Sequence, residues 1–86
     1  MSLISKIGDK FGEKLLGVII ADYGTLPANQ QGWTVAITLR RQKAGYPNLV
    51  FKWQCGGDTT WQKLEASPDV IARLETILQE TRQQLK

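Results

Sequence analysis

Six side chains in the middle of the chain have the residue types that single-stranded nucleic-acid binding requires. Cationic groups neutralise phosphates and release their counterions, and aromatic rings stack on unpaired bases. If the fold brings these side chains to one surface, they predict an interface for single-stranded DNA or RNA. They are Arg40, Arg41, Lys43, Lys52, Trp61 and Lys63.

The positive charge of the chain is concentrated in the same stretch. The net charge of the 86 residues is +3. Residues 32–63 carry +4, residues 1–31 carry 0 and residues 64–86 carry −1. A local excess of this kind indicates an anionic partner more directly than the total charge does.

Alternation between apolar and polar residues assigns four of these side chains, Arg40, Lys52, Trp61 and Lys63, to one face of a sheet. Residues 33–41 and 49–55 alternate strictly, as strands with one buried and one wet face do. The expected buried face contains Val35, Ile37, Leu39, Phe51, Trp53 and Leu64. The expected wet face contains Thr34, Thr38, Arg40, Val50, Lys52, Gln54, Trp61 and Lys63. A sheet face that is merely solvated would carry similar polar residues, so this alternative stays open.

The remaining elements follow from changes in hydrophobic period and from turn residues. Apolar residues at helical spacing predict a short, marginal helix at 2–14, which Gly8 and Gly12 weaken. Residues 15–21 are an apolar run, which predicts a strand at 15–23 that is covered on both faces. A loop at 24–32, the strands at 33–41, 49–55 and 59–64, and a helix at 67–86 complete the chain.

The C-terminal helix has the clearest start signal in the sequence. Ser67 can cap it, Pro68 suits the first helical position and Asp69 favours the positive end of the helix dipole. The chain is therefore expected to be one α+β domain over 1–86. Its four-stranded antiparallel meander would carry the amphipathic helix packed on one face. The apolar stripe of the helix comprises Val70, Ile71, Leu74, Ile77, Leu78 and Leu85.

The sequence lacks the residues that several kinds of functional site require. There is no histidine and one cysteine, Cys55, so neither an internal disulfide nor a Cys/His zinc site is possible within the chain. No nucleophile has an evident base, and we expect no enzyme activity, no metal and no cofactor. Cys55 is interpreted as a small buried hydrophobe. The longest apolar run, 15–21, is too short to cross a membrane, and we expect a cytoplasmic protein.

The order of strands followed by a helix resembles the positive-cofactor-four and Whirly group of single-stranded-DNA-binding proteins. In that group the last strand leads through a Leu-(Ser/Thr)-Pro-acidic step into the helix. The comparable stretch here is Leu64-Glu-Ala-Ser-Pro-Asp69, with two more residues between the leucine and the serine. The resemblance covers Leu15 to Leu85. It implies a homodimer formed through the helices, with DNA laid across the strands.

A non-enzymatic protein-interaction module is the alternative interpretation. A small regulatory or accessory subunit would use the sheet face or a sheet edge to bind a protein partner. The position of Trp61 separates the two interpretations. An exposed ring beside Lys52 and Lys63 favours nucleic acid, whereas a buried ring removes the one stacking residue expected on that face.

Overall fold

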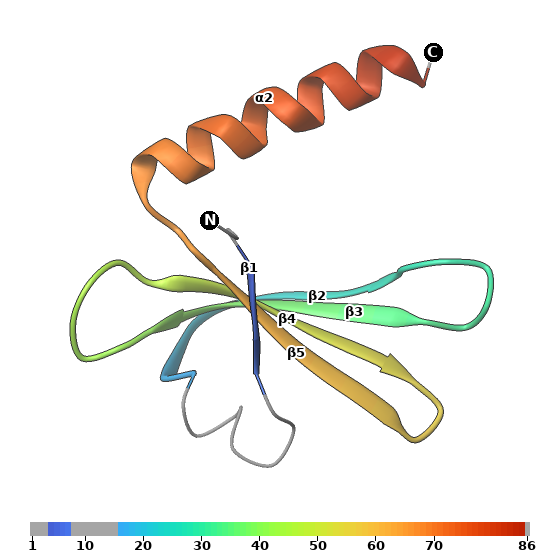
Figure 1. Cartoon of the computed structure of the whole chain (residues 1–86), viewed down its shortest axis with the longest axis horizontal. Coiled ribbons are helices and arrows are strands. Elements are labelled where there is room, and N and C mark those ends of the chain that lie inside the picture. The colour runs from blue at the N-terminus through green and yellow to red at the C-terminus, as the bar shows by residue number, and fades with distance from the viewer. Residues whose placement is uncertain (1–3, 8–15, 86) are drawn as a thin grey trace.

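The computed structural model describes residues 4–7 and 16–85, which form an antiparallel sheet followed by one helix (Figure 1). The expected α+β class, with an antiparallel sheet and a C-terminal helix, is confirmed. The strands are β1 (Ile4–Ile7), β2 (Val18–Pro27), β3 (Thr34–Arg41), β4 (Asn48–Cys55) and β5 (Asp58–Glu65), and the helix is α2 (Pro68–Gln84).

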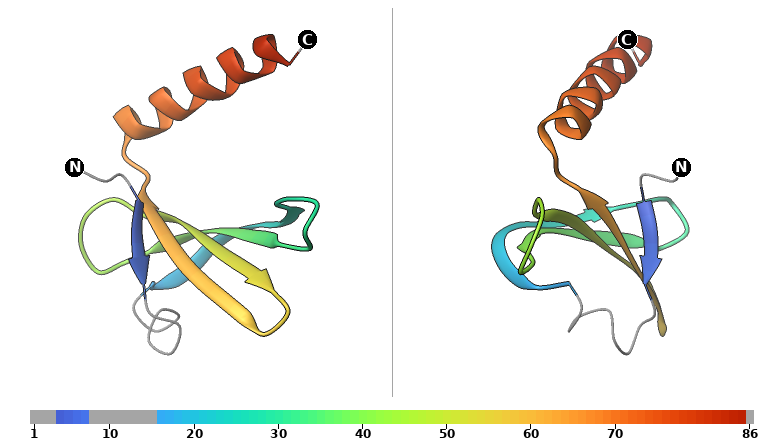
Figure 2. Two further views of the ribbon diagram at one scale, coloured as in Figure 1. Left: turned by 45° about the vertical axis from the view of Figure 1, so that its right-hand side comes forward. Right: turned by 60° about the vertical axis from the view of Figure 1, so that its left-hand side comes forward.

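The sheet is a meander with one additional strand. Its five strands are ordered β1-β5-β4-β3-β2, and every neighbouring pair is antiparallel. Strands β2 to β5 follow one another in space as they do in sequence. Strand β1 returns to pair with β5, so β1 and β2 are the two edges of the sheet (Figure 2).

The predicted N-terminal helix is wrong where the structure describes it. Ile4–Ile7 is strand β1, with Ile4 opposite Leu64 and Ile7 opposite Trp61. Without β1, one side of β5 would leave its backbone groups unpaired, and the β-branched isoleucines suit a strand. This pairing outweighs a helical pattern that two glycines already weaken. The rest of the predicted helix, residues 2–3 and 8–14, lies outside the described residues.

Strand β2 begins later than predicted and is not covered on both faces. It extends to Pro27 and pairs only with β3, which makes it an edge. Val18 is 75% exposed and Tyr23 is 60% exposed. Two register shifts interrupt the pairing, one between Ile19 and Ala21 and one between Asp22 and Thr25. Bulges of this kind are typical of sheet edges.

The central strands pair in the register that the alternation predicts. Lys52 lies opposite Trp61, and Val50 lies opposite Lys63, so all four side chains belong to one face. The opposite face receives the predicted apolar residues, which include the pairs Val35–Trp53, Ile37–Phe51 and Leu49–Leu64. The division of the sheet into two faces is therefore confirmed.

The most completely buried cluster, however, lies on the face that was expected to be wet. It consists of Leu16, Val50 and Trp61. Leu16, just before β2, is fully buried in this cluster and supplies apolar contact that the strands alone lack. The expectation that Val50 and Trp61 face water is wrong for this reason. On the opposite face Val35 and Leu64 are buried, whereas Phe51 and Trp53 are only half-buried.

Helix α2 starts as its sequence predicts. The Ser67 hydroxyl oxygen accepts a hydrogen bond from the Val70 backbone N–H at 3.3 Å, and Pro68 opens the first turn. Asp69 lies in the first turn and Arg82 in the last, where each charge favours the helix dipole. No helix in the described part of the chain is long and apolar enough to cross a membrane.

The predicted packing of α2 on the sheet is wrong. The helix has no buried residue and stands off the strands (Figures 1 and 2). Leu78 of its apolar stripe is 66% exposed. The Ala66 backbone N–H donates to the Pro47 carbonyl oxygen at 2.8 Å, and the helix departs from the sheet directly after this bond. Amphipathicity indicates which side of the helix requires a partner, but not which surface provides it.

We predict that Gly17→Ala destabilises the protein. Gly17 has a φ of +86°, and an added Cβ would overlap the Arg41 carbonyl oxygen. We expect a loss of about 2 kcal/mol or more in the free energy of unfolding, measured by urea denaturation. Gly24→Ala is the matched control, because Gly24 has a φ of +85° but open space around it. Its loss should be about 1 kcal/mol, and equal losses would contradict the close approach at Gly17.

Candidate functional site

Trp61 is the centre of the candidate site. Its side chain is 6% exposed, and two cations, one from β3 and one from β4, lie over its ring. The Arg40 Cζ atom is 5.7 Å from the ring centroid, and the Lys52 Nζ atom is 5.1 Å from it. Both distances allow cation–π attraction, which is stronger where water is excluded.

Arg40 is held in place by two weak partners. It is 6% exposed, and its Nε–H donates to the Thr38 hydroxyl oxygen at 3.1 Å. Burial of a charge is costly unless partners compensate for the lost water. Here the compensation consists of the Thr38 hydroxyl and the Trp61 ring, and neither of them carries a negative charge.

The structure brings four of the six predicted side chains together and leaves two apart. Arg40, Lys52, Trp61 and Lys63 share one sheet face. Lys63 is half-buried and lies diagonal to Lys52, because it pairs with Val50, two residues before Lys52 on β4. Arg41 projects toward the other face at the end of β3, and Lys43 lies in the exposed β3–β4 connection. We call Arg40, Lys52 and Lys63 the basic triad.

The basic triad has no carboxylate partner in the described part of the chain. In these residues Arg40 contacts Thr38 and Trp61, and Lys52 contacts Trp61. Lys63 forms no ion pair with any of them. Arg41 and Lys43 likewise have no ion pair within residues 4–7 and 16–85. Close cations without counter-charges produce a positive potential that attracts an anion.

The burial of Trp61 corrects its predicted role. A ring that is 6% exposed and covered by two cations does not offer a free face to a base. The sequence places Trp61 on the correct face but does not reveal that Leu16 packs there. This burial removes the stacking residue that was expected on this face, which counts against base stacking there. The charged groups that remain are the buried Arg40 and the half-buried Lys52 and Lys63.

A second group of side chains lies on the opposite face of the sheet, and it includes Trp53, which the sequence assigns to the buried face. Trp33 and Trp53 line a hollow of about 310 Å³ together with polar residues of β5 and the β2–β3 connection. Strand alternation correctly places Trp53 on the face opposite Lys52, but it cannot show that this face stays partly open. The other lining residues are Ala28, Asn29, Thr60 and Gln62.

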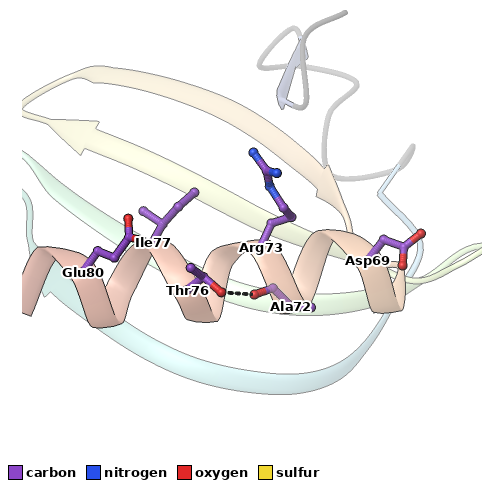
Figure 3. A pocket seen from close by; sticks show the side chains of 6 residues that line it. All are labelled: Asp69, Ala72, Arg73, Thr76, Ile77 and Glu80. Carbon is purple, nitrogen blue, oxygen red and sulfur yellow. Dashed lines mark hydrogen bonds between the residues drawn. The ribbon is translucent and has the colours of Figure 1, made fainter.

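A larger hollow, of about 610 Å³, runs along α2 (Figure 3). All of its described lining residues come from the helix itself, and the Thr76 hydroxyl donates to the Ala72 carbonyl oxygen at 3.2 Å. Asp69 and Arg73 line it one turn apart without an ion pair between them. The hollow is thus a helix surface, and no catalytic arrangement of side chains is evident in it.

Cys55 and the acidic residues form no further site in the described ranges. No group of three or more cysteine, aspartate or glutamate residues there could hold a metal ion. Cys55 is half-buried rather than buried, and its thiol lies 3.9 Å from the Gln31 carbonyl oxygen.

Comparison of the chain with protein-family models, with curated proteins and with solved structures gave no significant match. The assignment of function therefore depends on the geometry of the described residues.

Proposed function

We propose that this protein binds single-stranded DNA or RNA through the sheet face that carries the basic triad, with limited sequence specificity. The observation that supports the proposal best is the position of Arg40 and Lys52 against Trp61, beside Lys63, without a carboxylate partner in the described residues. A polyanion supplies the negative charge that this surface lacks.

The proposed contacts explain the limited specificity. Lysine and arginine bind phosphate oxygens, which are the same in every nucleotide. Trp61 holds the half-buried Lys52 in place, so less side-chain entropy is lost when this lysine binds, whereas the buried Arg40 contributes through its charge. Phosphate contacts also release counterions, which makes the affinity fall as the salt concentration rises.

Arg41 and Lys43 extend the positive surface beyond the basic triad. Both are exposed at the end of β3 and in the connection that follows. We propose that they contact phosphates on either side of those bound by the triad.

A reducing compartment such as the cytoplasm suits this protein, because Cys55 is a free thiol.

We predict that Lys52→Ala and Lys63→Ala each weaken binding of a single-stranded oligonucleotide about fivefold at low salt, because each removes one phosphate contact. The measurement is fluorescence anisotropy with a labelled oligonucleotide. Arg82→Ala is the matched control, since it removes the same charge from exposed α2, away from the sheet.

Equal effects of all three substitutions would show that only net charge matters and would contradict the assignment to this face. Circular dichroism should show the same melting temperature for Lys63→Ala and the control, whereas Lys52→Ala also removes a cation from over the Trp61 ring, so Lys63→Ala is the decisive variant. Arg40→Ala is less suitable as a test, because Arg40 is buried and its removal also alters the packing of Trp61.

Strand β2 favours a second candidate function, which is binding of a protein partner by strand addition. It is an edge strand, and apolar side chains such as Val18, Tyr23 and Leu26 are more than half exposed along it. An extended segment of a partner could pair with its free backbone groups. A partner that stays bound to the protein after nuclease digestion, together with no oligonucleotide binding at low salt, would favour this function.

We further propose that the protein is a homodimer that joins two copies of α2. Most of the stability of a helix in a protein comes from the packing of its apolar face, and no residue of α2 is fully buried within the single chain. Pairing of two apolar stripes would supply the missing burial. The resemblance to the positive-cofactor-four and Whirly group implies the same arrangement.

We predict that Leu78→Glu converts the dimer to a monomer, because it places a charge in the exposed apolar stripe of α2. Sedimentation equilibrium measures the mass directly. Gln79→Glu adds the same charge at an exposed neighbouring position and should leave the mass of two copies unchanged. A wild-type protein with the mass of one copy at micromolar concentration would contradict the dimer.

A further inference from the structure

The hollow beside Trp33 and Trp53 has an unusual set of polar groups. It lies on the sheet face opposite the basic triad and is lined by two indole rings, two side-chain amides and the Thr60 hydroxyl. Thr60 is the cross-strand neighbour of Trp53. The two amides belong to Asn29 and Gln62, and the hydrogen bonds that each makes determine which of its ends is left for a ligand.

The Asn29 amide uses its oxygen within the protein. Its Oδ1 atom accepts from the Gln31 backbone N–H at 2.9 Å and from the Trp33 backbone N–H at 3.3 Å. Because both partners are donors, the atom that faces them must be the oxygen. The NH₂ group of Asn29 has no hydrogen bond within the described residues and is available to a ligand.

The Gln62 amide is oriented in the same way. Its Oε1 atom accepts from the Trp53 indole N–H at 2.9 Å. An indole nitrogen can only donate, so the oxygen of Gln62 must face it. The Gln62 NH₂ group and the Trp33 indole N–H have no hydrogen bond in the part of the chain that the structure describes. The hollow therefore combines aromatic surface with hydrogen-bond donors.

A flat ring with carbonyl oxygens on its edge complements these groups. We propose that the hollow binds one unpaired thymine or uracil base, which stacks on indole and accepts hydrogen bonds from Asn29 and Gln62. Adenine carries an amino group on its Watson–Crick edge, and that donor would oppose the donors of the hollow. The binding of a free base needs only the hollow. The binding of a base that is part of a nucleic-acid strand rests on the proposed function.

The two faces are close enough for one strand to reach both. Lys52 and Trp53 are consecutive on β4 and project to opposite faces, and their partners Trp61 and Thr60 do the same on β5. Beyond them the chain turns at Gly56 and Gly57, which have open space around them. Lys52 is about 13 Å from Gly56, at 3.3 Å for each of four residues. A strand that passes over the turn would contact the basic triad on one face and the hollow on the other.

Uncharged nucleosides test the hollow without the basic triad. In an NMR titration of the full chain, thymidine should shift the side-chain signals of Trp33, Asn29 and Gln62, and should bind about fivefold or more tightly than adenosine. Equal binding of the two nucleosides, or no shift of these signals, would overturn the proposal.

Conservative variants of Asn29 and Gln62 distinguish the loss of a hydrogen-bond donor from a change in packing. Asn29→Asp and Gln62→Glu keep the oxygen acceptors that Trp33 and Trp53 require, but they lose the NH₂ donors. Each should abolish the preference for thymidine over adenosine while the melting temperature stays near that of the wild type. Variants that keep both the fold and the preference would contradict the role assigned to the amides.

Oligonucleotides distinguish failure of this inference from failure of the proposed function. An abasic strand and an oligothymidine strand of equal length carry the same phosphates. The hollow predicts about fivefold or more tighter binding of oligothymidine. Equal, salt-sensitive binding of both strands would leave the basic triad supported and the hollow refuted. Binding of thymidine without any salt-sensitive binding of either strand would refute the triad instead.

Discussion

Trp61 packs against Leu16 and Val50 on one face of the sheet, and its ring carries Arg40 from β3 and Lys52 from β4. This arrangement ties the small core to the positive surface. The cations have a fixed platform because the ring is buried, and the ring is covered because the cations lie over it. Their charge is not neutralised by a carboxylate in the described residues, so the surface remains able to bind an anion.

The distribution of apolar surface explains why this protein is expected to act with a partner. One sheet face buries Val50 and Trp61, while Phe51 and Trp53 on the other are only half-buried. Helix α2 adds an apolar stripe that no strand covers (Figure 1). A chain of 86 residues buries only a modest fraction of its surface on folding, so apolar side chains left exposed cost it a large share of its stability. A second copy and a nucleic-acid strand are the partners proposed for these surfaces.

The sequence was most informative where a local pattern has a single structural meaning. Alternation placed Lys52 and Trp61 on the same face, and Ser67 with Pro68 marked the start of α2. Contacts between segments far apart in the chain could not be predicted from the sequence. The contact of Leu16 with Trp61 and the pairing of Ile4 with Leu64 join segments far apart in the chain. Neither leaves a periodic signal, so the burial of Trp61 and the strand β1 were missed.

The candidate site, like the fold, could be predicted from the sequence only in those parts that depend on a local pattern. Charge counting located the basic stretch, and strand alternation placed Arg40, Lys52 and Lys63 on one face, because side chains two residues apart on a strand share a face. It could not show that Arg40 is buried, since that depends on the Trp61 ring and the Thr38 hydroxyl. The donor groups of Asn29 and Gln62 were equally hidden, because their orientation is set by hydrogen bonds that form only in the fold.

The salt dependence of oligonucleotide affinity tests the central claim most directly. If the basic triad, Arg41 and Lys43 neutralise phosphates, the logarithm of the association constant should fall linearly with the logarithm of the salt concentration. The expected slope is about −2 to −3.5, at roughly 0.7 for each of three to five single-strand phosphate contacts. A slope near zero, or no binding at low salt, would contradict a cationic nucleic-acid surface on this sheet.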